Sequence, residues 1–247
     1  LVVNEQIQQV EMQIAFVAGA TGYTGREVVR ELVGRGVRTV AHIRPDSLRV
    51  HEWRARFEAG GAAVDTTAWN DAAMTNTLSA LQPTHVFSLL GTTRARRRAS
   101  AARGKAESYE SIDYGLTALL IRAAVASGSR PRFVYLSSIG VREHSTNPYL
   151  VARWRAESLL RASGLPYTIA RPSFITGPGR DESRPLERAG AGVANVIAGL
   201  ARVVGARRFA GSVRSLTGAE LAAALVRHAF DPAGENVTIG TDELAAV

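Results

Sequence analysis

Tyr149 and Arg153 are the two residues whose types and spacing most directly suggest chemistry. Residues at positions i and i+4 of a helix lie on one face, so the guanidinium can lie beside the phenol. A free tyrosine has a pKa of about 10, and bringing it near neutrality needs roughly 4 kcal/mol, much of which a fixed cation can supply. Since arginine does not release its own proton, the pair fits a proton-donating phenol beside a cation that does not relay protons.

The segment GATGYTG, residues 19–25, has the spacing Gly-x-x-Gly-x-x-Gly between an expected strand and an expected helix. Gly19 permits a tight turn, Gly22 lets the backbone approach a pyrophosphate, and Gly25 lets the helix pack closely on the strand. The helix N-terminus adds N–H groups and a partial positive charge. The sequence therefore predicts a dinucleotide-binding loop. The expected cofactor contacts in it are Gly19, Thr21, Gly22, Tyr23, Thr24 and Gly25.

The end of the second expected strand bears on which dinucleotide binds. Arg44 stands about 20 residues past the loop, where an acidic side chain would mark NAD. Its planar guanidinium matches the oxygens of a 2′-phosphate, which a carboxylate would repel. In the alternative interpretation, Asp46 accepts hydrogen bonds from ribose hydroxyls and Arg44 is a surface cation. We expect NADP(H) as the cofactor, ahead of NAD(H).

The ends of the next two expected strands supply further candidates for the cofactor site. In a doubly wound sheet, the carboxyl ends of the strands line the cofactor crevice. Asp65 is a candidate for the adenine edge, and Gly91 for close passage of the backbone, with Leu90 and Thr92 beside it. Each of them is equally compatible with an ordinary turn.

The elements that must hold these residues alternate along the chain. Runs rich in β-formers occur at residues 14–19, 38–43, 62–64, 84–91, 132–138 and 166–171, with helical spacing between them. This alternation predicts an α/β fold, a Rossmann-type doubly wound parallel sheet covered by helices on both faces.

The rhythm changes after Arg171, where we expect a small C-terminal lobe for a substrate or partner. A helix is expected at residues 189–204, and another from a capping box at Thr217 and Glu220 to about Phe230, before a closing strand. The predicted division is an N-terminal leader at 1–13, an NAD(P)-binding Rossmann core at 14–171, and a lobe at 172–247 that completes the same domain.

The charge balance is basic, but it does not by itself identify a partner. The 247 residues carry 30 basic and 22 acidic side chains, a net charge of +8. Because Lys105 is the one lysine and the chain is rich in Ala, Gly and Arg, compositional bias explains the arginines. The cluster RARRR at 94–98 fits a solvated loop, with a phosphate contact as the alternative. Without a base-reading motif, and with 6% aromatic residues, we do not expect nucleic acid as a partner.

Several classes of protein are excluded by what the sequence lacks. There is no cysteine, which excludes disulfides and thiolate ligands, and the five histidines are too dispersed for a metal site. No apolar run reaches the roughly 18 to 20 residues that span a bilayer, and the first residues lack the features of a secretory signal. We therefore expect no metal, no transmembrane segment and a cytoplasmic location.

Taken together, the motifs resemble the atypical short-chain dehydrogenases/reductases, and most closely the Tat-interacting-protein group of NADPH-binding proteins and its bacterial relatives. The resemblance covers nearly the whole chain. It rests on GATGYTG, GTTR at 91–94 followed by Lys105-Ala106, SID at 111–113, YLSS at 135–138, YLVAR at 149–153 and DESRP at 181–185.

The resemblance implies a Rossmann-type core that holds NADPH. It implies that Ser138 orients a carbonyl oxygen that Tyr149 protonates, while the residue four positions after the tyrosine binds the nicotinamide ribose. It also implies that Pro172 and Ser173 present backbone to the carboxamide, although a plain strand exit explains them nearly as well. The family places lysine where this chain has Arg153, and that exchange is not conservative.

Three interpretations of the tyrosine site remain open. In the first, compositional bias has replaced lysine with Arg153, and the protein is an active reductase of a small carbonyl or enone. Alternatively, the chain binds NADPH without turnover, as a regulatory or redox-sensing protein that acts through a protein partner. In the third interpretation, Ser138 and Tyr149 only pack. An apolar segment near residues 192–200 is compatible with core packing, with a partner surface or with a homodimer.

Overall fold

The computed structural model describes residues 12–92, 107–173, 175–176 and 215–246. Several expectations lie outside these residues: most of the leader, the cluster at 94–98, Lys105, DESRP at 181–185 and the helix at 189–204. The seven strands of the main sheet are β1 (Ile14–Ala18), β2 (Arg38–His42), β3 (Ala63–Asp65), β4 (His85–Ser88), β5 (Arg132–Leu136), β6 (Tyr167–Arg171) and β9 (Val237–Gly240).

The sheet is parallel throughout and has the order β3-β2-β1-β4-β5-β6-β9. The order reverses at β1, so β2 and β4 lie on either side of it and leave a crevice at their carboxyl ends. This is the doubly wound α/β fold that the alternating pattern predicts.

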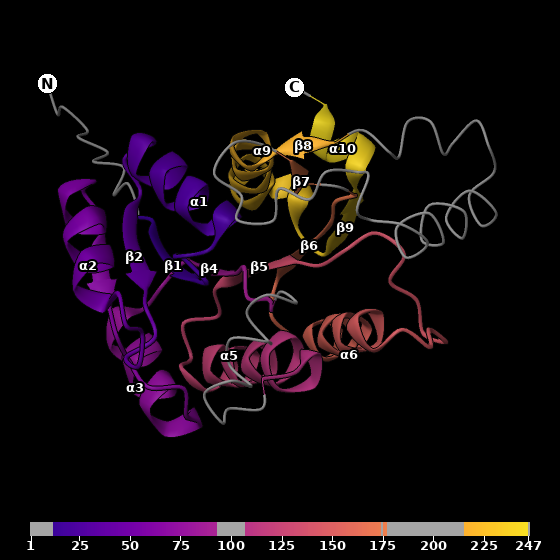
Figure 1. The fold of residues 1–247 in the computed structure, drawn as a ribbon, viewed down its shortest axis with the longest axis horizontal. Helices are drawn as coiled ribbons and strands as arrows, with labels where there is room; N and C mark the ends of the chain where they lie inside the picture. The colour runs from indigo at the N-terminus through magenta and orange to yellow at the C-terminus, as the bar shows by residue number, and fades with distance from the viewer. Residues whose placement is uncertain (1–11, 93–106, 174, 177–214, 247) are drawn as a thin grey trace, which may run out of the picture.

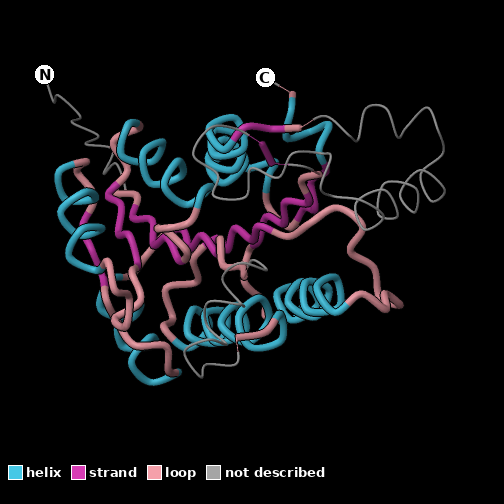
Figure 2. The backbone as a smooth tube through the Cα atoms, in the orientation of Figure 1, coloured by secondary structure: helices cyan, strands magenta, loops and turns pink. Residues whose placement is uncertain are grey.

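Helices cover both faces of the sheet (Figures 1 and 2). The helices are α1 (Tyr23–Gly34), α2 (Val50–Ala59), α3 (Asp71–Leu81), α5 (Thr117–Ala126), α6 (Pro148–Ala162), α9 (Gly218–Phe230) and α10 (Thr241–Ala245). In Figure 1, α1, α9 and α10 lie on one side of the sheet and α3, α5 and α6 on the other. Successive residues of one strand serve opposite faces: Val17 packs in the core under α1 and α9, and Phe16 in the core over α3, α5 and α6.

The C-terminal part joins the same sheet through β9, and α9 packs against α1. Thr217 caps α9 in a capping box with Glu220, as predicted. A two-stranded sheet of β7 (Ile175–Thr176) and β8 (Leu216–Thr217), and the short helices α10 and η3 (Pro232–Gly234), were not expected from the sequence. The proposed division at residue 171 stays a prediction.

One helix departs from regular geometry beside the crevice. The helix between β4 and β5, where the sequence shows helical spacing, begins as a π-helix, η1 (Tyr109–Leu116), and continues as α5. Ser108 caps η1 through Ser111. A π-helical turn is rare in proteins and often lies at a functional site, and η1 carries Asp113, which is fully buried.

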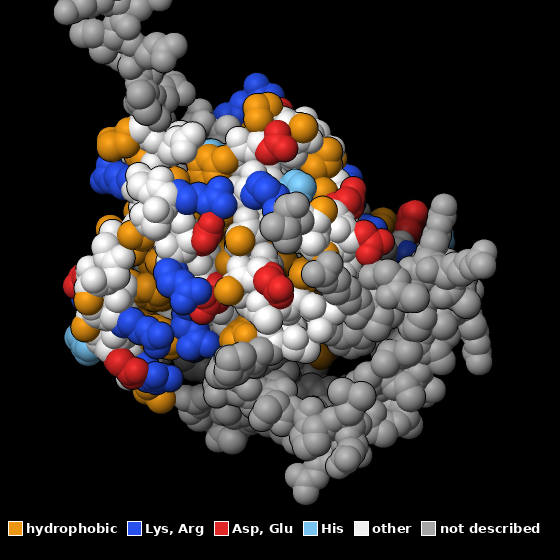
Figure 3. Space-filling view, turned by 90° about the horizontal axis from the view of Figure 1, so that it is seen from above, with side chains coloured by type: hydrophobic (Ala, Val, Ile, Leu, Met, Phe, Trp, Pro, Cys, Tyr) orange, Lys and Arg blue, Asp and Glu red, His pale blue; other side chains and the backbone are white. Residues whose placement is uncertain are grey.

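Charge is distributed without a single-sign surface on the face seen in Figure 3. Over the described part of that face, arginine side chains are interspersed with acidic ones. Ion pairs at i,i+4 spacing include Glu31 with Arg35 at the end of α1 and Arg54 with Glu58 in α2. Among the helices that the structure describes, none is long and apolar enough to cross a membrane.

Candidate cofactor and active site

At Gly19 and Gly25 of the glycine loop, the neighbouring backbone leaves no space for a side chain. Gly19 has φ +83°, and a Cβ there would lie 2.6 Å from the carbonyl oxygen of Leu89. A Cβ on Gly25 would lie 2.1 Å from the carbonyl oxygen of Gly19. The loop closes with a hydrogen bond from the Gly22 amide to the Gly19 carbonyl, 3.0 Å long. Since Gly22 is the N-cap of α1 and no acidic residue lies in the first turn, the helix end can accept an anion.

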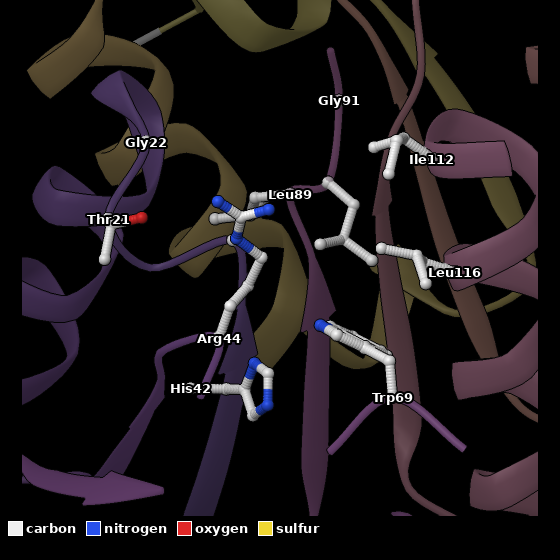
Figure 4. A pocket seen from close by; sticks show the side chains of 11 residues that line it. Thr21, Gly22, His42, Arg44, Trp69, Leu89, Gly91, Ile112 and Leu116 are labelled. Carbon is white, nitrogen blue, oxygen red and sulfur yellow. The ribbon is translucent and has the colours of Figure 1, made fainter. Parts of the chain in front are cut away.

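A pocket opens between this loop and the ends of β2 and β4 (Figure 4). Six residues predicted from the sequence line it: Gly19, Thr21, Gly22, Arg44, Leu90 and Gly91. Five further residues, which sequence reasoning missed, complete the lining: His42, Trp69, Leu89, Ile112 and Leu116. Local sequence holds little signal for the second group because each is an apolar or aromatic residue typical of a core.

Arg44 lies at the mouth of the pocket, half exposed, and is bound by two carboxylates. Its Nη1 donates a hydrogen bond to Glu107 Oε1 at 3.1 Å, and its Nε lies 3.7 Å from Asp46. The Glu107 side chain is 12% exposed. The guanidinium is therefore held between Glu107, which precedes η1, and Asp46, which follows β2, and an anionic ligand would have to compete with Glu107.

Asp65 and His42 stand side by side at the ends of β3 and β2. The carboxylate of Asp65 accepts hydrogen bonds from the Thr67 amide at 3.0 Å and from the Thr67 hydroxyl at 2.9 Å. His42 donates to the Thr67 carbonyl through Nε2 at 2.9 Å. Burial lowers the pKa of His42, although that hydrogen bond and Asp65 oppose the shift. Asp65 thus caps its own turn, and it is absent from the pocket lining.

Arg153 is buried at the carboxyl end of the sheet and donates four hydrogen bonds through its terminal nitrogens. Nη2 donates to Asp113 Oδ1 at 2.8 Å and to the Leu90 carbonyl at 3.1 Å. Nη1 donates to the Leu136 carbonyl and to the Tyr135 hydroxyl. Nε is buried and has no partner within the part of the chain described. Four of its five donors therefore bind the protein itself.

The charge of Arg153 is matched by its surroundings. Asp113 is fully buried and also accepts from the Thr92 amide at 3.1 Å. Burial alone would lower the pKa of Arg153, but Tyr135, Tyr149 and Asp113 raise it overall. Burial raises the pKa of Tyr135 to about 12, against the opposing effect of Arg153. The guanidinium is therefore permanently charged, with Asp113 as its counter-ion.

Gly91 makes room for this arrangement. A Cβ at Gly91 would lie 2.8 Å from Arg153 Nη2. The sequence predicted that the cofactor passes close to the Gly91 backbone. In the structure, the Arg153 guanidinium lies close to it. Gly91 also lines the pocket, so one glycine serves both.

Tyr149 and Ser138 lie outside the pocket lining. Tyr149 lies at the start of α6, which Asn147 caps by accepting from the Tyr149 amide. Its ring packs edge-on against Tyr109, with centroids 5.3 Å apart, and the Arg153 guanidinium lies 5.2 Å from its centroid. Ser138 follows β5, and its hydroxyl makes a long hydrogen bond, 3.3 Å, to the Ile139 carbonyl. Both side chains are partly exposed.

A buried carboxylate that the sequence reading overlooked orders the neighbouring strand ends. Glu157 is fully buried in α6 and accepts hydrogen bonds from Ser137 at 2.6 Å, from Arg171 at 2.9 and 2.5 Å and from Arg161 at 2.9 Å. It lies one turn after Arg153. The signal available was this spacing, since an acid four residues after a buried cation shares its face.

The remaining candidates have mainly structural contacts. The Tyr23 hydroxyl donates to the Thr176 carbonyl at 3.0 Å, and its ring lies where a Cβ on Gly218 would be, 2.6 Å away. Thr24 is buried in α1. The Pro172 carbonyl accepts from the Ile139 amide at 3.0 Å, and Ser173 follows it at the end of β6. No one of these residues lines the pocket.

The sheet order and the glycine loop at its reversal point define an NAD(P)-binding protein of Rossmann type. Residues 19–202 match the NAD(P)H-binding family, and the chain belongs to that family. The resemblance to atypical short-chain dehydrogenases/reductases and the expected fold are both confirmed.

Relatives and solved structures agree with this assignment. The chain is 34% identical over 189 residues to fmp52-1 of Aspergillus terreus, covering 74% of this chain and 73% of that protein. It is 29% identical over 185 residues to a ceramide reductase of Caulobacter vibrioides, covering 70% and 50%. The fold matches WbmH of Bordetella bronchiseptica in complex with NAD⁺, with TM-score 0.61 and 17% identity over 93% and 76% of the two chains. It also matches a UDP-glucose 4-epimerase of Thermotoga maritima, with TM-score 0.59 and 20% identity over 93% and 77%.

The expected cytoplasmic location is wrong by this comparison. The fmp52 proteins that resemble the chain, among them those of Aspergillus terreus and Debaryomyces hansenii, are named as mitochondrial. The absence of cysteine, on which the expectation rested, does not distinguish between reducing compartments.

Proposed function

We propose that the chain binds NADP(H) and reduces a small carbonyl or enone by hydride transfer, with Tyr149 as the proton donor. The observation that carries the proposal is the single pocket shared by the glycine loop, Arg44 and Gly91. These residues fit the cofactor. The loop and the N-terminus of α1 can hold the pyrophosphate, and Arg44 can hold a 2′-phosphate.

The second half of the proposal concerns the proton. When bound, the cofactor supplies a hydride, and the reduced oxygen then needs a proton and hydrogen-bond donors. The hydroxyl of Ser138 follows β5, and the hydroxyl of Tyr149 lies at the start of α6, the next helix in the chain. Both side chains are partly exposed. We assign Tyr149 as the donor of the proton and Ser138 as the second hydrogen-bond donor.

Arg153 has a different role from the lysine of the family. Its terminal nitrogens bind the protein, so Nε is the donor left for a ribose hydroxyl. Its charge lies over the ring of Tyr149 and is offset by Asp113. The guanidinium therefore holds the strand ends together and adds a fixed field, without relaying protons.

This network also favours a second candidate function. Arg153 binds Asp113 and the carbonyls of Leu90 and Leu136. This network can hold the site rigid without taking part in proton transfer. The alternative is an NADP(H)-binding regulatory or redox-sensing protein that acts through a protein partner. We further propose that residues 172–247 contact the substrate in the first case and the partner, or a second copy of the chain, in the other.

A turnover assay separates the two functions. NADPH oxidation is followed with a panel of aldehydes, ketones and enones, including a ceramide-like lipid because one relative is named a ceramide reductase. With an active substrate, we expect Tyr149→Phe to lower kcat at least about 100-fold and to leave the Kd for NADPH within about twofold. Tyr109→Phe, which removes a neighbouring hydroxyl, is the matched control.

The outcomes are distinct. A Tyr149→Phe variant as active as the wild type would remove the proton-donor assignment. Tight NADPH binding without turnover on the whole panel would favour the regulatory function. If the chain binds neither NADPH nor NADH, both proposed functions are overturned.

A further inference from the structure

Trp69 holds a buried hydrogen-bond donor without a partner inside the pocket. The residue lies between β3 and α3 and lines the pocket across from Arg44 (Figure 4). Its indole Nε1 is shielded from solvent and makes no hydrogen bond to any described residue. Tryptophan N–H groups usually find a partner when buried, and no residue in the described part of the chain accepts from this one, so the donor is available to a ligand of the pocket.

The neighbours of Trp69 fix the indole but do not accept its proton. His42 packs edge-on against the indole, with ring centroids 4.7 Å apart, and is itself held by the Thr67 carbonyl. Each oxygen of the nearby Asp65 carboxylate already accepts a hydrogen bond from Thr67. The side chain that the sequence suggested for the adenine edge is therefore engaged in its own turn.

The rest of this end of the pocket is apolar and lies across from the sheet. Ile112 and Leu116 of η1 line the pocket (Figure 4), and Leu90 is also part of the lining. Such a wall suits the faces of a planar aromatic base and offers no competing hydrogen bond. A base that enters here meets apolar side chains on its faces and the N–H group of Trp69, with Arg44 across the pocket.

We propose that Trp69 Nε1 donates a hydrogen bond to a ring nitrogen of the adenine of the dinucleotide. The inference rests on the proposed function, because it takes the nucleotide as the ligand of this pocket. It adds a specificity-determining residue for the base beside Asp65, whose predicted role at the adenine edge stays a prediction. Adenine ring nitrogens are acceptors, so the indole donor matches the ligand that the glycine loop and Arg44 select through its phosphates.

The test measures the binding of 2′,5′-ADP, 5′-AMP and NMNH to the full chain by calorimetry. Trp69→Phe keeps an aromatic ring and removes the N–H group. We expect the Kd for 2′,5′-ADP and for 5′-AMP to rise about 5- to 10-fold, while NMNH, which lacks adenine, binds as it does to the wild type. Trp154→Phe, in α6 and away from the pocket lining, is the matched control and leaves all three affinities unchanged.

A second variant distinguishes hydrogen bonding from stacking. If Trp69→Phe binds both adenine nucleotides like the wild type and Trp69→Leu does not, the indole only stacks and the donor assignment is overturned. Equal losses for NMNH and the adenine ligands would also overturn it, since the variant would then have disturbed the whole pocket. A wild-type chain that binds neither adenine nucleotide contradicts the proposed function itself, which separates the two failures.

Discussion

Asp113 Oδ1 and Arg153 Nη2 lie 2.8 Å apart, and both side chains are buried, 0% and 7% exposed. They come from η1 and α6 and meet under the backbone of Gly91 at the carboxyl end of β4. A buried ion pair adds little net stability, but the loss of one partner leaves an unpaired charge in the interior. The pair therefore constrains the crevice more than it stabilises the fold.

A double-mutant cycle checks this coupling. We expect Asp113→Asn to lower the free energy of unfolding by about 3 to 5 kcal/mol, and Arg153→Met by a similar amount, because each leaves a buried charge. The double variant should lose at least about 1 kcal/mol less than the sum of the two, as measured by urea unfolding. Additive losses would contradict the pairing.

Two glycines of α1 form a matched pair for the loop geometry. Gly25→Ala places a Cβ 2.1 Å from the Gly19 carbonyl oxygen, whereas Gly34→Ala meets no atom within 4 Å. We expect Gly25→Ala to abolish measurable NADPH binding and to destabilise the fold, because the Gly19 carbonyl oxygen belongs to the backbone and cannot move aside. Gly34→Ala should bind normally and gain about 0.5 to 1 kcal/mol of stability. NADPH titration and thermal unfolding check both, and a Gly25→Ala variant that binds like the wild type would contradict the loop assignment.

Glu107 accepts a hydrogen bond from Arg44, the residue proposed to hold the 2′-phosphate of NADP(H). We expect Glu107→Gln to tighten NADPH binding about 3- to 10-fold, because the variant removes a negative charge and frees the guanidinium. NADH binding should stay within about twofold. Arg44→Gln should weaken NADPH about 10- to 100-fold and leave NADH unchanged. Fluorescence titration with both nucleotides measures the ratio, and equal changes for NADPH and NADH would rule out a 2′-phosphate contact.

His85 makes stability depend on pH. Burial lowers its pKa from 6.5 to about 4, with Arg132 adding to the shift, although a hydrogen bond to the Ala229 carbonyl opposes it. Between these values the unfolded chain binds a proton that the folded chain does not, so stability falls as the pH falls from 6.5 toward 4. The expected loss between pH 7.5 and pH 5 is about 2 kcal/mol from this group.

Urea unfolding at pH 7.5 and pH 5 tests the sign and the source. His85→Gln keeps a donor for the Ala229 carbonyl and should lose about 2 kcal/mol less than the wild type on acidification. His51→Gln changes an exposed histidine of α2 and should follow the wild type. The same pH dependence in all three proteins would show that other groups are responsible.

The elements that depend on residues close together in the chain could be predicted from the sequence. Strand and helix alternation predicts the doubly wound sheet, because side-chain periodicity is a local property. GATGYTG predicts the loop at residues 19–25 because its glycines meet conformational demands within one turn. The capping box at Thr217 predicts the start of α9 for the same reason.

The contacts of the charged and polar side chains near the crevice could not be predicted from the sequence and follow from the tertiary structure. Arg153 and Asp113 are 40 residues apart, and Glu157 binds Arg171 across two elements. Trp69, in the segment between β3 and α3, and Ile112, in η1, line the same pocket. Parallel strands bring their carboxyl ends together at one edge, so residues distant in the chain become neighbours there, and no local pattern records which of them meet.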